Sequence, residues 1–242
     1  MNAYRMQVRT ELMLSLRQGE QLLVSVGIPL LILVFFSLTG VLPIPEGFAK
    51  TVDFLAPGVL ALAVMSSAMV SLGIGTGFER QYGVLKRLGA TPLGRGRLVA
   101  AKISMVLVLE LIQVVVLVTA ALALGWRPSG SIIAALPAFV LGTAAFAGLG
   151  LLLAGTLSGT VNLAATNGLY LLLLLLGGMV VPVDRLPSGV RAIAEVLPAA
   201  ALSETVLGAF SASATASAKA WAVLAAWAIA MPLVAARSFR WE

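Results

Sequence analysis

Six runs of apolar residues, each near the length that crosses a lipid bilayer, constrain this chain more than any other feature. A hydrocarbon core about 30 Å thick needs roughly 20 helical residues, because each residue rises about 1.5 Å. Only 11% of the residues are charged and 60% are hydrophobic. We therefore expect an all-α integral membrane protein with six transmembrane helices in a single domain, 1–242. The predicted spans are 22–42, 55–77, 103–124, 132–153, 163–181 and 220–236.

The chain contains no Cys and no His. These absences exclude disulfides, thiolate metal sites, a Cys nucleophile and a Ser–His hydrolase of the rhomboid type. A metal-dependent phosphatidyl transferase needs clustered aspartates, but the only two, Asp53 and Asp184, fall in separate outer loops. We therefore predict no catalytic residue, no metal site and no cofactor in this chain, which we do not expect to be an enzyme.

The distribution of Lys and Arg predicts the orientation of the chain. With the N-terminus inside, eleven Lys and Arg residues fall on the cytoplasmic side and five on the outer side. This bias follows the positive-inside rule and predicts a multi-pass protein of the cytoplasmic membrane with both termini in the cytoplasm. The net charge is +6. We expect the basic residues to contact membrane lipids and protein partners, and we expect no binding of nucleic acid. We expect no cleaved signal peptide, because the first apolar run is too long.

Residues 1–21 are amphipathic. Apolar residues recur every four positions, with arginines around them. This pattern predicts a helix that lies in the membrane interface, and a plain basic leader is the alternative. The apolar positions are Tyr4, Val8, Leu12 and Leu16.

The segment 182–219 is the longest on the outer side. Leu186, Val190, Ile193 and Leu197 form a helical stripe that ends at Pro198, and a second short apolar run follows. A disordered loop contains fewer Leu and Val residues than this. We therefore expect short re-entrant helices between the fifth and sixth spans.

The segment 78–98 reads FERQYGVLKRLGATPLGRGRL and is unusually basic for this chain. Its glycine spacing approaches that of a phosphate-binding loop, which requires Lys-Ser/Thr after the last glycine. Arg95-Gly96 stands at that place, and no strand precedes the glycines. We therefore predict no nucleotide site in this chain.

The same segment has the order of a short helix, a turn and a new helix. Glu79 suits the start of the short helix, and Lys86 and Arg87 suit its C-terminal end. Gly89 can end it, and Thr91-Pro92 can begin the next helix. Val84, Leu85 and Leu88 would share one apolar face beside a basic flank. Two interpretations stay open at this point: a basic loop that anchors two spans to headgroups, or a surface that docks a partner.

Glu79–Leu88, followed by Ala90-Thr91-Pro92-Leu93, resembles the loop between the second and third spans of ABC-2-type transporter permeases. The similarity is closest to the drug-resistance, daunorubicin-exporter-like branch. Gln81 stands where that family has a second acidic residue, and Val84 stands where it has Thr. The resemblance extends to Gly177-Gly178 and to the segment 196–207, which is similar to the family's outer re-entrant region.

The resemblance implies the permease subunit of an exporter that moves a drug or lipid-like substrate out of a bacterial cell, as in multidrug efflux and antibiotic resistance. ATP and Mg²⁺ would then bind two copies of a separate ATPase subunit, and a second copy of this chain or a related permease would complete the path. The segment 78–98 would be the coupling helix. The residues assigned to ATPase docking are Glu79, Arg80, Tyr82, Gly83, Val84, Leu85, Lys86, Arg87, Leu88, Thr91 and Pro92.

Several residues inside the predicted spans are polar or adaptable. Glu110 is costly in a bilayer, by roughly 2.5–3.5 kcal/mol at mid-helix, so it should face the protein interior. It either packs against a neighbouring helix or contacts substrate or protons. An ion-gradient-driven carrier that uses Glu110 is therefore the second functional hypothesis, and a purely structural membrane subunit is the third. The candidate substrate-path residues are Met65, Met69, Glu110, Gln113, Asn162, Asn167 and Tyr170, for which simple packing is the alternative.

Glycines cluster in two of the predicted spans, at Gly73–Gly77 and Gly142–Gly155. Small residues let membrane helices approach closely, so we expect packing faces at both clusters. A hinge at Gly73–Gly77 is the alternative.

Overall fold

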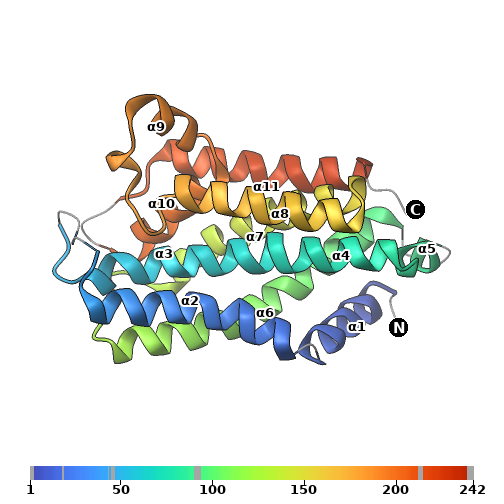
Figure 1. Ribbon diagram of the computed structural model, residues 1–242, viewed down its shortest axis with the longest axis horizontal. Coiled ribbons are helices and arrows are strands. Elements are labelled where there is room, and N and C mark those ends of the chain that lie inside the picture. The colour runs from blue at the N-terminus through green and yellow to red at the C-terminus, as the bar shows by residue number, and fades with distance from the viewer. Residues whose placement is uncertain are drawn as a thin grey trace.

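The computed structural model is a bundle of helices (Figure 1). It describes residues 3–17, 19–42, 44, 47–89, 94–211 and 215–238. Every regular element in these ranges is helical, which confirms the predicted all-α class. The elements are α1 (Ala3–Arg17), α2 (Gly19–Thr39), α3 (Thr51–Met65), η1 (Ser66–Ser71), α4 (Leu72–Gln81), α5 (Val84–Gly89), α6 (Arg95–Ala123), α7 (Ile132–Thr156), α8 (Gly159–Leu176), η2 (Val183–Arg185), α9 (Ser188–Ala194), α10 (Pro198–Phe210) and α11 (Ala218–Ser238).

Five helices in the described part of the chain are long and apolar enough to cross a membrane. They correspond to the second to sixth predicted spans, and α2 occupies the first. The apolar part of α2 whose side chains are described is Ser25–Thr39. Several helices extend beyond the predicted bounds, because helices do not end where hydropathy falls. The predicted end of the fifth span at 181 is wrong, since α8 ends at Leu176, where Gly177 and the left-handed Gly178 follow.

The second span is the central helix of the bundle. It runs without interruption from Thr51 to Gln81 through α3, η1 and α4. In its most apolar window 83% of the residues are buried, against 22% in α8 and in α11. Its middle part, η1, is a π-helix, a form that proteins often place at functional positions. Nothing in the sequence predicted this change of helical pitch.

Two of the glycines bring the central helix against α7. A Cβ atom at Gly150 would lie 2.6 Å from the Met69 carbonyl oxygen, and one at Gly73 would lie 3.0 Å from the Gly150 Cα. These spacings leave no room for a larger residue. The Asn162 side-chain amide of α8 also donates to the Gly73 carbonyl at 2.9 Å. The predicted packing role is therefore confirmed at Gly73 and Gly150.

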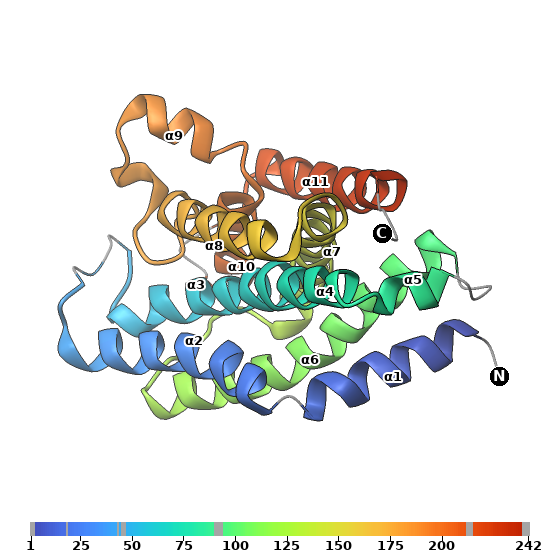
Figure 2. The same cartoon turned by 45° about the vertical axis from the view of Figure 1, so that its right-hand side comes forward.

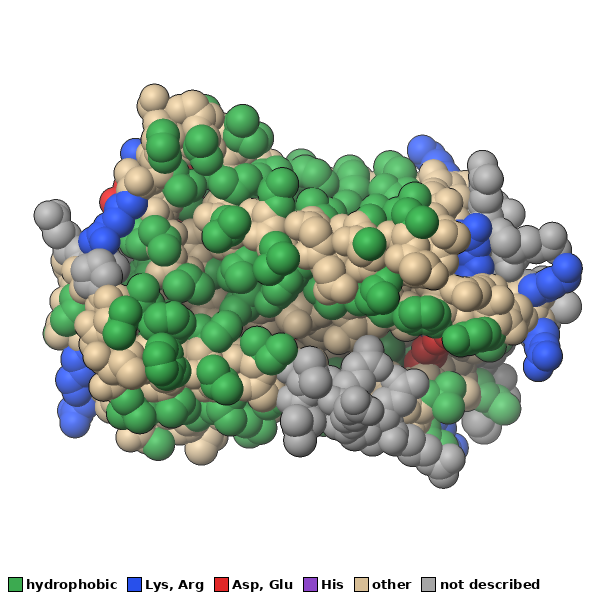
Figure 3. All heavy atoms as spheres, viewed as in Figure 1, with side chains coloured by type: hydrophobic (Ala, Val, Ile, Leu, Met, Phe, Trp, Pro, Cys, Tyr) green, Lys and Arg blue, Asp and Glu red, His purple; other side chains and the backbone are tan. Residues whose placement is uncertain are grey.

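The two ends of the bundle carry different elements. Both termini and α5 lie at one end, while η2, α9 and the α2–α3 connection lie at the other (Figures 1 and 2). Blue Lys and Arg side chains gather at the two ends of the face in Figure 3, and apolar side chains cover the band between them. The predicted orientation of the chain in a membrane stays a prediction.

The segment between α8 and α11 folds back into the bundle. Helices α9 and α10 meet at an angle of 80°, and α10 packs against α3 and α7. Backbone bonds join the end of α10 to the start of α7, with the Ser129 N–H donating to the Phe210 carbonyl at 3.1 Å. The short helices expected after the fifth span are therefore present.

Candidate functional site

The predicted docking segment begins with a glycine turn. Helix α4 continues through Gln81, and Gly83 adopts a φ of +74°, a left-handed conformation that favours glycine. Helix α5 then begins at Val84. Glu79 therefore lies in the last turn of α4, so the expectation that it opens the short helix is wrong. Lys86 and Arg87 do lie in the last turn of α5, as predicted.

Helix α5 packs its apolar side against its own chain. Leu85 of α5 and Leu98 of α6 are 0% and 1% exposed, and Leu88 packs against them. The opposite side of the turn stays accessible, with Tyr82 70% and Val84 41% exposed and with the Lys86 and Arg87 side chains exposed. The surface that a partner can reach is therefore aromatic and basic, and Leu85 is not part of it.

A buried lysine holds this end of the bundle together. Lys102 of α6 is 1% exposed, and its Nζ lies 2.8 Å from a Glu79 oxygen of α4 and 3.0 Å from a Glu11 oxygen of α1. An ammonium removed from water needs such partners, because the cost of desolvating a charge is several kcal/mol. The three side chains therefore fix α1, α4 and α6 to one another. Lys102 is one of the eleven Lys and Arg residues that the sequence assigns to the cytoplasmic side, and its burial between two acids was not predicted.

Arg80 connects the same end to α7. Its guanidinium donates to the carbonyls of Ala154 at 3.0 Å and Leu157 at 3.1 Å. These carbonyls lie at the C-terminal end of α7, where the helix dipole favours a cation. Arg80 thus makes contacts within its own chain.

The predicted docking residues therefore separate into two groups. Glu79, Arg80 and Leu85 make contacts inside the bundle, with Gly83 at the turn and Leu88 partly buried beside it. The exposed group is Tyr82, Val84, Lys86 and Arg87. Thr91 and Pro92 lie outside the described residues.

The polar residues predicted for a substrate path do not converge. Glu110 is 4% exposed and accepts from the Thr143 hydroxyl of α7 and, at 3.3 Å, from the Ser67 hydroxyl of η1. Gln113 donates to the Ser25 carbonyl of α2 at 3.1 Å. These contacts join helices, which agrees with a packing role for both side chains.

The other candidate substrate-path residues are not among the hydrogen-bond partners of Glu110 and Gln113 described above. Met65 and Met69 are fully buried in the central helix, and Asn162 is buried against Gly73. Tyr170 is partly buried and Asn167 is exposed, both on α8. Their role as a substrate path stays a prediction.

Comparison with known families decides the class of this protein. The family model described as ABC-2 type transporter matches residues 3–211. The chain belongs to the ABC-2 type transporter family. ABC-2 membrane domains are the permease subunits of ATP-binding-cassette transporters, have no nucleotide site of their own and work with an ABC ATPase. A comparison with curated proteins gave no match.

The buried lysine gives a direct test of how this end of the permease is held. Lys102→Met leaves the buried Glu11 carboxylate and the partly buried Glu79 carboxylate without a cation, so we expect the free energy of unfolding to fall by about 3–5 kcal/mol. The measurement is thermal unfolding of the purified chain in detergent. Lys86→Met changes an exposed lysine nearby and should stay within about 0.5 kcal/mol.

A compensating variant separates charge from packing in that experiment. Glu11→Gln, Glu79→Gln and Lys102→Met together remove all three charges, and this triple variant should recover much of the lost stability. A Lys102→Met chain as stable as the original would contradict the structural role of the lysine.

Proposed function

We propose that this permease exports a hydrophobic or amphipathic substrate and is driven by a separate ABC ATPase that docks on the exposed side of α5. The docking surface consists of Tyr82, Val84, Lys86 and Arg87. Two copies of the ATPase and a second copy of this chain, or a related permease, would complete the transporter.

The docking proposal rests on one observation: α5 has an exposed side that a partner can reach and a buried side that packs against the rest of the chain. Tyr82, Val84, Lys86 and Arg87 are exposed, while Leu85 packs on α6 and the preceding turn holds Glu79 and Arg80 in interhelical contacts. A displacement of α5 by a partner is therefore passed to α1, α4, α6 and α7. An anchoring loop for headgroups requires no such connection.

The exposed apolar faces support a second permease subunit. Helix α6 exposes Leu111, Ile112 and Val115, with relative accessibilities of 63%, 48% and 59%. Only 39% of the apolar window of α6 is buried within this chain. Such a face meets either lipid or another transmembrane helix, and a path between two copies would use it.

The ion-gradient alternative depends on Glu110, and its surroundings favour packing. Each oxygen of the Glu110 carboxyl contacts a hydroxyl group, from Thr143 and Ser67. Both hydroxyls also lie within hydrogen-bonding distance of a carbonyl of their own helix, those of Phe139 and Ala63. In the described part of the chain, the side-chain partners of Glu110 are the two hydroxyls and include no second titratable group, and a proton relay usually needs one.

Glu110→Gln distinguishes the two functions. The amide keeps one acceptor oxygen and adds donors for Thr143 and Ser67, so ATP-driven transport should stay within about twofold of the original. Transport is measured in inside-out vesicles with and without an uncoupler of the proton gradient. Loss of transport both in this variant and after uncoupling, with ATP present, would support the carrier instead.

Charge reversal tests the docking surface. Lys86→Glu with Arg87→Glu should reduce ATPase co-purification and ATP-driven transport by roughly tenfold or more, because an opposing charge at an interface costs several kcal/mol. The matched control is Arg127→Glu with Arg185→Glu, which reverses two exposed arginines at the opposite end. Both variants should insert and unfold like the original chain. Full coupling in the Lys86/Arg87 variant would refute the docking surface.

A further inference from the structure

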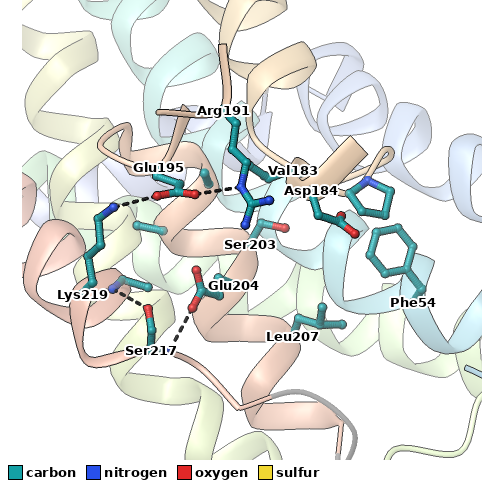
Figure 4. Close-up of a pocket in the computed structure, with 15 residues that line it drawn as sticks. Phe54, Val183, Asp184, Arg191, Glu195, Ser203, Glu204, Leu207, Ser217 and Lys219 are labelled. Carbon is teal, nitrogen blue, oxygen red and sulfur yellow. Dashed lines mark hydrogen bonds and ion pairs between the residues drawn. The ribbon is translucent and has the colours of Figure 1, made fainter. Parts of the chain in front are cut away.

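A cavity opens at the end of the bundle opposite α5. It has a volume of about 390 Å³ and lies between η2, α9, α10 and the start of α11 (Figure 4). Phe54, Val183 and Leu207 form an apolar part of its wall. Charged side chains line the rest of the cavity, and a wall that is part apolar and part charged suits a portion of an amphiphile.

One side of the cavity carries cations held by a shared carboxylate. Glu195 accepts from Lys219 Nζ at 2.7 Å and from Arg191 Nε at 2.9 Å. These two hydrogen bonds, that of Lys219 first, lower the pKa of Glu195, so it stays ionised and orients both cations. The terminal nitrogens of Arg191 point toward Ser203 (Figure 4), and no described residue pairs with them.

The cavity also offers acceptors that lack a cationic partner. The Asp184 carboxylate lines it and makes no hydrogen bond or ion pair with a described residue. Glu204 accepts only the Ser217 backbone N–H, at 2.8 Å, among described residues. Ser203 is 6% exposed, and its hydroxyl faces the cavity without a described partner (Figure 4).

The cavity therefore presents both positive and negative side chains to any molecule that enters it. A simple anion would meet Asp184 and Glu204, and a simple cation would meet the Arg191 guanidinium. In the described residues no group of three His, Cys, Asp or Glu side chains could hold a metal ion. A zwitterion satisfies both sets of groups. The cavity lies at the starts of α3 and α11, which belong to helices long enough to cross a membrane, and a headgroup lies where such helices leave the hydrocarbon core.

We propose that this cavity binds a phosphoethanolamine-type zwitterion. Its phosphate accepts from the Arg191 terminal nitrogens and the Ser203 hydroxyl, since guanidinium groups suit phosphate. Its ammonium meets the carboxylate of Asp184 or of Glu204, which lie on opposite sides of the Arg191 guanidinium in Figure 4, and the attached apolar chain runs along Phe54 and Leu207. This site is separate from the proposed ATPase docking surface, and ligand binding by the purified chain tests it without any transport.

The experiment measures binding of two short-chain lipids with equal acyl chains to the purified full chain in detergent, by native mass spectrometry. Dihexanoyl phosphatidylethanolamine should bind about tenfold more tightly than dihexanoyl phosphatidylglycerol, which lacks the ammonium. Asp184→Asn with Glu204→Gln should abolish this preference. Arg191→Gln should weaken the binding of both lipids by about tenfold. Arg127 is an exposed arginine at the same end, and Arg127→Gln should change the binding of neither lipid.

Water-soluble phosphoethanolamine identifies the source of the ligand. If it competes at a concentration similar to that of the lipid, the ligand is the free headgroup; if only the lipid binds, the apolar wall is required. Either result supports the zwitterion site. Equal binding of the two lipids by the original chain, or an unchanged preference in the Asp184/Glu204 variant, would overturn it. If that double variant does not fold, unweakened binding by Arg191→Gln would also overturn it.

Discussion

The contact of one buried ammonium with two carboxylates organises the end of the bundle where α5 lies. Lys102 is 1% exposed and joins Glu11 and Glu79, which belong to helices far apart in the sequence. An unpaired charge at this place would be strongly destabilising, because little water reaches it. The relative positions of α1, α4 and α6 therefore depend on this contact. Arg80 also joins α4 to α7, because its guanidinium donates to the carbonyls of Ala154 and Leu157.

A single helix connects this end to the opposite one. The segment Thr51–Gln81 has 31 residues, about 46 Å at 1.5 Å per residue. Its first turn places Phe54 in the wall of the cavity opposite α5, and its last turn supplies Glu79 and Arg80 to the α5 end. Its π-helical part provides Ser67 to Glu110. A displacement at α5 and a ligand in the cavity would therefore act on the same helix.

The sequence predicted what depends on local composition. Apolar runs indicated the helices, and Lys86, Arg87 and Gly89 indicated the end of a short helix, but the turn at Gly83 that precedes it was not predicted. Hydropathy and spacing cannot reveal that Arg80 meets Ala154 or that Leu85 packs on Leu98, because those partners are contributed by other helices. The sequence assigns Lys102 only to the cations of the cytoplasmic side, and its burial could not be predicted for the same reason. The cavity opposite α5 was missed because the sequence of 182–219 does not show which of its side chains the bend between α9 and α10 brings together.

The central claim is that the exposed side of α5 receives the ATPase while its buried side moves the bundle. Photo-crosslinking measures this contact directly, with a photoreactive amino acid placed at Tyr82 or Val84, or at Ile193, which is 59% exposed at the opposite end. The account predicts an ATPase adduct from positions 82 and 84 in the assembled transporter and none from 193. An adduct from 193 alone, or an assembled and active complex with no adduct at 82 or 84, would contradict it.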